Sequence, residues 1–143
     1  MPSPPNQTQS LRIFIVEDHA DSLKYLAMYL QQCGHKVAHA QGVTEAVAAL
    51  GVEKPDVLLT DISLPDGTGW DLMEKLRKAR RLPKFAIAMS GFGMNADRVK
   101  SAAAGFRCHL LKPLNPEQLD GALADAARER GGADERGSAA ALS

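Results

Sequence analysis

The sequence predicts an α/β fold, a doubly wound parallel sheet of five strands with helices on both faces. Short apolar, β-favouring segments alternate with segments of helical periodicity five times between residues 11 and 130. The sequence shows no hairpin signals between these segments, so each strand must return through a helix. Segment 56–61 carries an uninterrupted apolar run, as expected of a strand that is buried on both faces.

Composition and charge fit one soluble globular domain. The chain has 143 residues, of which 45% are hydrophobic and 24% are charged, enough to build a core without disulfides or a structural metal. Seventeen basic residues balance seventeen acidic ones, so no global field attracts nucleic acid or an anionic membrane. Cys33 and Cys108 lie far apart without CxxC or His-rich spacing, which argues against a zinc site and fits a reducing compartment.

The two ends of the chain are expected to be disordered. Residues 1–10 are polar and Pro-rich and lack the apolar segment of a signal peptide, and residues 131–143 are rich in Gly, Ala and charge. One domain at 11–130 remains. No apolar run approaches the roughly 20 residues of a membrane span. We therefore expect a cytoplasmic protein without a membrane partner.

The first two strand-helix units precede residue 51. Residues 11–16 form an apolar strand closed by two acids, and the helix after it ends near Gly34, a natural helix stop. The inner stripe of that helix consists of Leu23, Leu26, Ala27 and Leu30. Residues 36–40 form a short second strand, and a helix from about Thr44 to Leu50 follows.

The third unit contains an apolar, β-favouring strand that ends in an acid. Pro55 breaks the chain before this strand, 56–61, which ends in the carboxylate of Asp61. A helix from about Thr68 to Arg80 follows, and its basic end suits the negative C-terminus of a helix.

The fourth and fifth units complete the pattern. Strand 85–90 is rich in alanine, which suggests a crowded central position, and loop 91–93 leads to an Ala-rich helix, 95–104. That helix has few large side chains to anchor it, so we expect it to move easily. Strand 107–111 precedes a last helix, which Asn115-Pro116 opens with a cap and a proline at its first position.

Polar residues end or directly follow four of the five strands. Glu17 and Asp18 follow the first, Asp61 ends the third, Ser90 ends the fourth and Lys112 follows the fifth. Right-handed crossovers favour the strand order 2-1-3-4-5, the flavodoxin-like arrangement. In that order these residues gather at one edge of the sheet, around the switch point where ligands bind.

The gathered residues have the chemistry of a phosphoryl site. Three carboxylates this close repel one another by a few kcal/mol per pair at an effective dielectric constant of about 20, so the cluster needs a positive partner. Oxygen ligands of this kind suit Mg²⁺ or Mn²⁺ better than zinc. A metal, a lysine and a hydroxyl around one carboxylate supply charge neutralisation and a hydrogen bond to a phosphoryl oxygen. Asp61 is then a candidate nucleophile.

Taken singly, each residue also has a structural role open to it. Asp61 before a Gly-containing turn and Asp18 before a helix are both typical of helix caps. Ser90 fits turn chemistry, and Lys112 before a proline fits an exposed surface. The functional interpretation depends on their convergence at one sheet edge.

Together these residues resemble the receiver domain of two-component response regulators, over roughly residues 11–130. The residues that carry the resemblance are Glu17, Asp18, Asp61, Pro65, Gly69, Ser90, Lys112 and Pro113. The stretch 105–113 is most similar to receivers attached to hybrid sensor kinases or serving them.

The resemblance implies a phosphorylation switch. Asp61 would accept a phosphoryl group from a phosphohistidine on a sensor histidine kinase or a histidine phosphotransfer protein, with Mg²⁺ (or Mn²⁺) required. The metal ligands would be the carboxylates of Glu17, Asp18 and Asp61 and the backbone carbonyl of Ser63. Lys112 would pair with the phosphoryl oxygens, and the Ser90 hydroxyl would swing in to bond one of them.

Two positions depart from the family's usual pattern. Glu17 stands where aspartate is commoner, which lengthens one arm of the metal site. His109, three residues before Lys112, stands where the switch aromatic is usually tyrosine or phenylalanine, whereas Phe106 is expected in the core. His109 is the candidate switch residue that follows Ser90, and its imidazole offers pH sensitivity.

The expected output is a changed protein-binding face around helix 95–104, strand 107–111 and the last helix. We expect no DNA-binding or catalytic domain in the short stretch after residue 130. We therefore expect output through a target protein or a phosphorelay, without direct nucleic-acid contact. The chain would not be an enzyme beyond catalysing its own phosphotransfer and dephosphorylation.

Two other functions stay open. A phosphatase of the haloacid-dehalogenase type also uses a strand-end aspartate, but it needs a second acid two residues later, where this chain has Ser63. A pseudo-receiver would bind partners without phosphorylation. The complete set of acids, hydroxyl and lysine argues against it.

Overall fold

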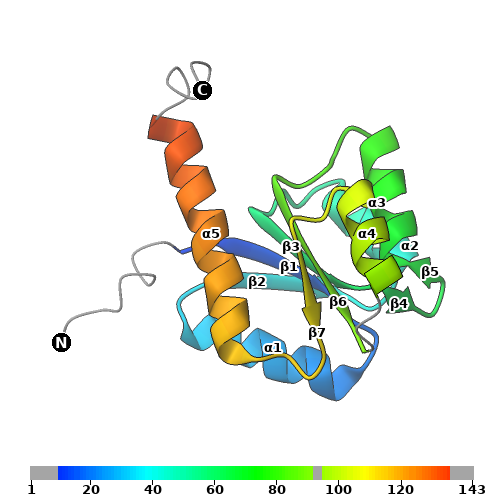
Figure 1. Ribbon diagram of the computed structural model, residues 1–143, viewed down its shortest axis with the longest axis horizontal. Coiled ribbons are helices and arrows are strands. Elements are labelled where there is room, and N and C mark those ends of the chain that lie inside the picture. Colours follow the sequence, from blue (N-terminus) through cyan, green and yellow to red (C-terminus); the bar gives the residue numbers. More distant parts are fainter. Residues whose placement is uncertain (1–9, 92–94, 136–143) are drawn as a thin grey trace.

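A five-stranded parallel sheet forms the centre of the molecule in the computed structural model, which describes residues 10–91 and 95–135 (Figure 1). The strand order is β2-β1-β3-β6-β7. The strands are β1 (Arg12–Val16), β2 (Lys36–Ala40), β3 (Val57–Asp61), β6 (Phe85–Ser90) and β7 (Cys108–Leu111). Counted along the chain, this is the predicted order 2-1-3-4-5, so the flavodoxin-like fold is confirmed.

Helices cover both faces of the sheet. The first face carries α1 (Ala20–Gln32) and α5 (Pro116–Glu135) (Figure 1). The second face carries α2 (Val43–Leu50), α3 (Gly69–Lys78) and α4 (Asn95–Ala104). Alternation along β1 builds both cores, because Ile13 and Ile15 pack towards the first face and Phe14 and Val16 towards the second.

Strand β3 lies at the centre of the sheet and is buried along its whole length. It pairs with β1 on one side and with β6 on the other, in a register that runs from Val57 opposite Phe85 to Asp61 opposite Met89. A strand covered on both faces favours apolar side chains, which explains the apolar run from Val57 to Leu59. The register leaves Asp61 at the carboxyl end of the sheet.

A small antiparallel hairpin follows β3, which the sequence did not predict. Strands β4 (Ser63–Leu64) and β5 (Gly67–Thr68) pair across a two-residue turn. Gly67 has a φ of 151°, a backbone conformation that side chains disfavour. Two-residue strands are too short to show alternation, so this hairpin left no periodic signal.

The described residues extend beyond both ends of the predicted domain, 11–130. Helix α5 runs to Glu135, so the tail expected from Gly131 onwards begins inside this helix. Two glycines cost a helix about 1 kcal/mol each, which a long helix with favourable Ala, Glu and Arg neighbours tolerates. At the other end, the Ser10 hydroxyl donates to the Gly34 carbonyl. Residues 1–9 and 136–143 lie outside the described residues, and so does most of the predicted loop 91–93.

Within the described part of the chain, no helix has the length and apolar character needed to cross a membrane. Helix α4 was predicted to be weakly anchored. Among its described side chains, Val99 is exposed and the polar Ser101 is buried.

Candidate functional site

The carboxyl edge of the sheet brings the predicted site residues together. Backbone hydrogen bonds continue beyond two strand ends, from the Glu17 N–H to the Ala40 carbonyl (3.1 Å) and from the Lys112 N–H to the Ser90 carbonyl (2.8 Å). These bonds extend the parallel pairing by one residue beyond β1 and β7. Glu17 and Lys112 therefore lie next to the end of β3, where Asp61 is only 5% exposed.

The Lys112 ammonium bridges two carboxylates. Its Nζ donates to Oδ2 of Asp61 at 2.5 Å and to Oε1 of Glu17 at 2.7 Å. Glu17 is completely buried, so its charge depends on this contact for compensation. The bridge joins residues that are 51 and 95 positions apart in the chain.

The contacts of this bridge shift the pKa values of Glu17 and Lys112 so that each group favours its charged form. Burial by itself raises the pKa of Glu17, but the hydrogen bond from Lys112 and the N–H of His19 outweigh it and bring the pKa below its usual value. Burial likewise lowers the pKa of Lys112, whereas its hydrogen bonds to Asp61 and Glu17 raise it overall. Both groups are therefore charged at neutral pH.

The backbone behind Asp61 holds its carboxylate in place. The Ser63 N–H donates to Oδ1 of Asp61 at 3.1 Å, and the Gly69 N–H donates to the Ile62 carbonyl at 2.8 Å. A Cβ atom added to Gly69 would lie 2.9 Å from the Asp61 carbonyl oxygen, closer than real Cβ contacts allow. Gly69 is thus required by the close approach of α3 to the end of β3.

The acidic residues fit a divalent cation. Glu17, Asp18, His19 and Asp61 each offer one ligand atom, and these atoms lie within 4.8 Å of one another. Among the described residues, Oδ1 of Asp18 is a buried atom without a hydrogen-bond partner. A buried carboxylate oxygen normally has a donor, so this atom is available to a cation. The Ser63 carbonyl as a further ligand stays a prediction.

His19 belongs to this edge although the sequence analysis did not select it. Its Nδ1 lies 3.1 Å from Oε2 of Glu17 and 3.5 Å from Oδ1 of Asp18, and its side chain is 72% exposed. The position of His19 directly after Glu17 and Asp18 was the one sequence feature that pointed to the site. A single histidine forms no periodic pattern, so it was not selected.

Ser90 and His109 are hydrogen-bonded to each other. Oγ of Ser90 lies 2.7 Å from Nε2 of His109, and Nδ1 of His109 lies 3.0 Å from Oγ of Ser101 on α4. The imidazole therefore already points towards β6 and α4. Ser101 also accepts a hydrogen bond from Nε1 of Trp70 on α3, at 3.0 Å. Sequence reasoning missed Ser101 and Trp70, because only packing brings α3, α4 and β7 together.

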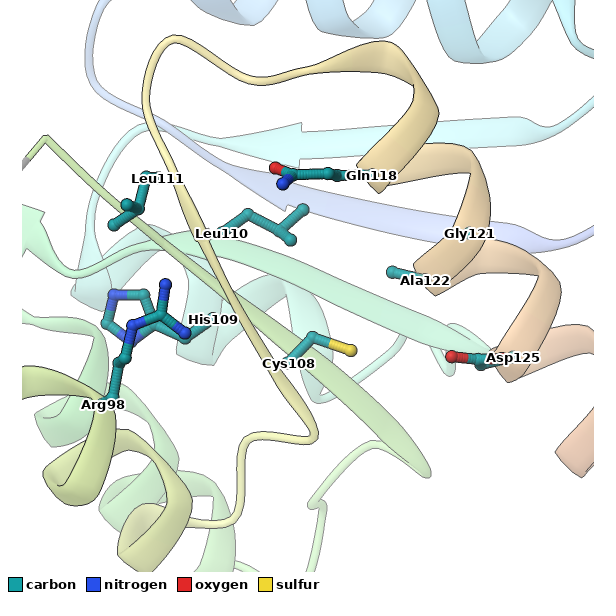
Figure 2. Close-up of a pocket in the computed structure, with 9 residues that line it drawn as sticks. All are labelled: Arg98, Cys108, His109, Leu110, Leu111, Gln118, Gly121, Ala122 and Asp125. Atoms are coloured by element: carbon teal, nitrogen blue, oxygen red, sulfur yellow. The ribbon is translucent and has the colours of Figure 1, made fainter. Parts of the chain in front are cut away.

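A groove of about 380 Å³ opens over β7, between α4 and α5 (Figure 2). Figure 2 shows its floor along β7 and its walls on the two helices. Arg98 contributes a positive charge on the α4 side, and Asp125 a negative one on the α5 side. The elements of the predicted partner face thus lie side by side at one sheet edge.

Comparisons with known proteins point to one family. A family model described as the response regulator receiver domain matches residues 13–124. An uncharacterized 14.6 kDa protein of Leptolyngbya boryana is 32% identical over 110 residues, 75% of this chain and 82% of that protein. The phosphate regulon transcriptional regulatory protein PhoB of Escherichia coli (strain K12) is 30% identical over 76% of this chain and 48% of PhoB. The chain thus spans about half the length of PhoB.

Solved structures agree. A two-component response regulator from Clostridium difficile superimposes with a TM-score of 0.76 at 26% identity, over 82% of this chain and 95% of that one. The N-terminal domain of an uncharacterized protein from Wolinella succinogenes gives a TM-score of 0.77 at 27% identity, over 85% and 97% of the two chains.

Proposed function

This chain belongs to the response regulator receiver domain family, and on that premise we propose that it is a phosphorylation switch with Asp61 as the phosphoacceptor. The observation that carries the proposal is the bridge at the end of β3. There the Lys112 ammonium touches Asp61 and Glu17, next to an Asp18 oxygen that lacks a hydrogen-bond partner. The Asp61 carboxylate lies beside the Lys112 ammonium and beside acidic residues that could bind a divalent cation. This arrangement suits phosphoryl transfer.

In the proposed reaction, a carboxylate oxygen of Asp61 attacks the phosphorus of a phosphohistidine in line with the P–N bond. The O–P bond forms as the P–N bond breaks. The electron pair of the P–N bond returns to the donor's imidazole, which takes up a proton. Lys112 Nζ lies on Oδ2 of Asp61, so it can follow the negative charge onto the phosphoryl oxygens. The product is an aspartyl phosphate.

Glu17, Asp18, Asp61 and the backbone carbonyl of Ser63 would hold the Mg²⁺ or Mn²⁺ ion. When bound, the ion offsets the repulsion among the carboxylates and the incoming phosphoryl oxygens. The chain's own residues do the remaining work. Ser63 and Gly69 fix the acceptor, and the Ser90 hydroxyl donates to a phosphoryl oxygen once the group is in place.

Receiver domains of two-component systems work with histidine kinases, and we propose a sensor kinase or a histidine phosphotransfer protein as the donor. The response would reach a target protein through the groove over β7 and its walls, α4 and α5. We further propose cytoplasmic action without membrane or direct nucleic-acid contact, and no reaction on other substrates.

The test uses a small phosphodonor. With Mg²⁺ and acetyl phosphate, the wild-type protein should gain one phosphoryl group that is stable in acid and labile in base. Asp61→Asn should gain none, and Asp21→Asn, an exposed aspartate in the first turn of α1 and outside the cluster, should label like the wild type. Equal labelling of Asp61→Asn would contradict the assignment. Hydrolysis of a phosphate ester over many turnovers would favour a phosphatase instead.

A further inference from the structure

A chain of four hydrogen-bonded side chains leads away from the proposed phosphorylation site. It runs from Ser90 on β6 to His109 on β7, then to Ser101 on α4 and to Trp70 on α3. The three links measure 2.7, 3.0 and 3.0 Å. The chain crosses four elements and ends where Lys100 stacks over the indole, 4.3 Å from its centroid.

The two serines of the chain are shielded from water. Ser101 is 1% exposed and Ser90 is 7% exposed. A buried hydroxyl without a hydrogen bond costs free energy, so a change in one hydrogen bond of the chain is expected to change the next one. An indole N–H can only donate, which means that Ser101 accepts from Trp70 and keeps its remaining capacity for His109.

His109 can link both ends because an imidazole has a hydrogen-bonding nitrogen on each side. Nε2 faces Ser90 and Nδ1 faces Ser101. Figure 2 shows the ring on the α4 side of β7, whereas Leu110 points towards α5. A phenyl ring could fill the same space but could make neither bond.

We propose that His109 is a positioning residue for the Ser90 hydroxyl, and that the Ser90–His109–Ser101–Trp70 chain carries the phosphorylation state of Asp61 to the α3–α4 surface. The inference rests on the proposed function, because it needs a phosphoryl group on Asp61. Ser90 ends the strand next to β3, where Asp61 pairs with Met89. When Ser90 turns its hydroxyl to a phosphoryl oxygen, its bond to Nε2 of His109 must change. The imidazole then alters its bond to Ser101, and Ser101 its bond to the indole.

The chain contains its own reporter, because Trp70 is the only tryptophan in the sequence. The indole N–H resonance in a ¹H–¹⁵N spectrum reports directly on the hydrogen bond to Ser101. The experiment records this resonance with Mg²⁺, before and after addition of acetyl phosphate, while intact-mass analysis measures phosphorylation in the same sample.

Two variants break the chain at different links. His109→Phe keeps an aromatic ring but removes both nitrogens, and Ser101→Ala removes the middle hydroxyl. His39→Phe, the same substitution at an exposed position of β2, is the matched control. Thermal unfolding of each variant establishes that it is folded. Because the two variants alter different elements, one that folds is enough for the test.

We expect the indole resonance to shift on phosphorylation in the wild type and in His39→Phe. In His109→Phe and Ser101→Ala we expect phosphorylation of Asp61 without that shift. A folded, phosphorylated His109→Phe or Ser101→Ala that retains the wild-type shift would overturn the inference, as would a phosphorylated wild type whose indole resonance stays unchanged. Absence of phosphorylation in the wild type would contradict the proposed function itself, and the mass measurement separates that result from the others.

Discussion

Lys112 is the residue on which the charge balance of the site depends. It neutralises a fully buried Glu17 and contacts Asp61 at the same time. Removal of its ammonium leaves the two carboxylates facing each other without compensation, which increases their demand for a cation.

We therefore expect Lys112→Ala to bind Mg²⁺ at least as tightly as the wild type, but to respond only weakly to phosphorylation. This variant lacks the ammonium group that would pair with the phosphoryl oxygens. A Mg²⁺ titration measures the first effect, and the spectroscopic change on addition of acetyl phosphate measures the second. Lys36→Ala, an exposed lysine on β2, is the control. A full conformational response in Lys112→Ala would show that the lysine has another role.

Gly69 offers a second test at the scale of one residue. A methyl group there would press on the Asp61 carbonyl oxygen and on Ile62. We expect Gly69→Ala to destabilise the fold by about 1–3 kcal/mol, as overpacking does, and to slow phosphorylation because the acceptor strand must shift. Gly121→Ala is the matched control, since its Cβ meets nothing within 4 Å and its helix gains up to about 1 kcal/mol. Urea unfolding of both variants decides the comparison, and a neutral Gly69→Ala would refute the packing argument.

Sequence reasoning works well for residues that end a strand. Strand ends are visible as changes from apolar to polar residues, so Glu17, Asp18, Asp61 and Lys112 were found without a structure. Ser101 and Trp70 lie inside helices and meet His109 only through packing. Their spacing in the chain carries no sign of that contact.

At the scale of elements, the unpredicted hairpin β4–β5 supplies the cap of a distant helix. Helix α2 begins after Gly42, which has no side chain to cap it. The Asp66 carboxylate accepts from the Val43 N–H at 2.7 Å and from the Thr44 N–H at 2.9 Å. Both bonds lower the pKa of Asp66 below its ordinary value of 3.8, and the bond from the Thr44 N–H has the larger effect.

This cap predicts a pH-dependent effect. A lowered pKa in the folded state means that the ionised carboxylate adds stability at pH values above 3.8, which is lost as the pH falls below it. We expect Asp66→Asn to unfold at a lower urea concentration than the wild type at neutral pH. The gap should close in acid, where the wild type also becomes neutral. A gap of constant size across the pH range would show that the charge is irrelevant to the cap.

The element order was predictable because a parallel sheet with right-handed crossovers admits few arrangements. The length of α5 was not. The stretch from Gly131, rich in Gly, Ala and charge, was predicted to be a disordered tail, whereas the helix continues to Glu135. A helix end is a balance of small propensities, which a local pattern does not settle.

At the scale of the whole molecule, the parallel sheet is what assembles the site. Residues from β1, β3, β6 and β7 meet because adjacent parallel strands end at the same edge. The helices then divide the work. Helices α1 and α5 bury one face, while α3 and α4 connect to the site through Ser101 and His109.

The most direct test of this account is the position of the phosphoryl group itself. Borohydride reduces an aspartyl phosphate to homoserine, which marks the acceptor covalently. After incubation with Mg²⁺ and acetyl phosphate, reduction and proteolysis, peptide mass spectrometry should find homoserine at position 61 and nowhere else. Homoserine at another aspartate, or a phosphate that remains on a serine, threonine or histidine, would contradict the central claim that Asp61 is the acceptor.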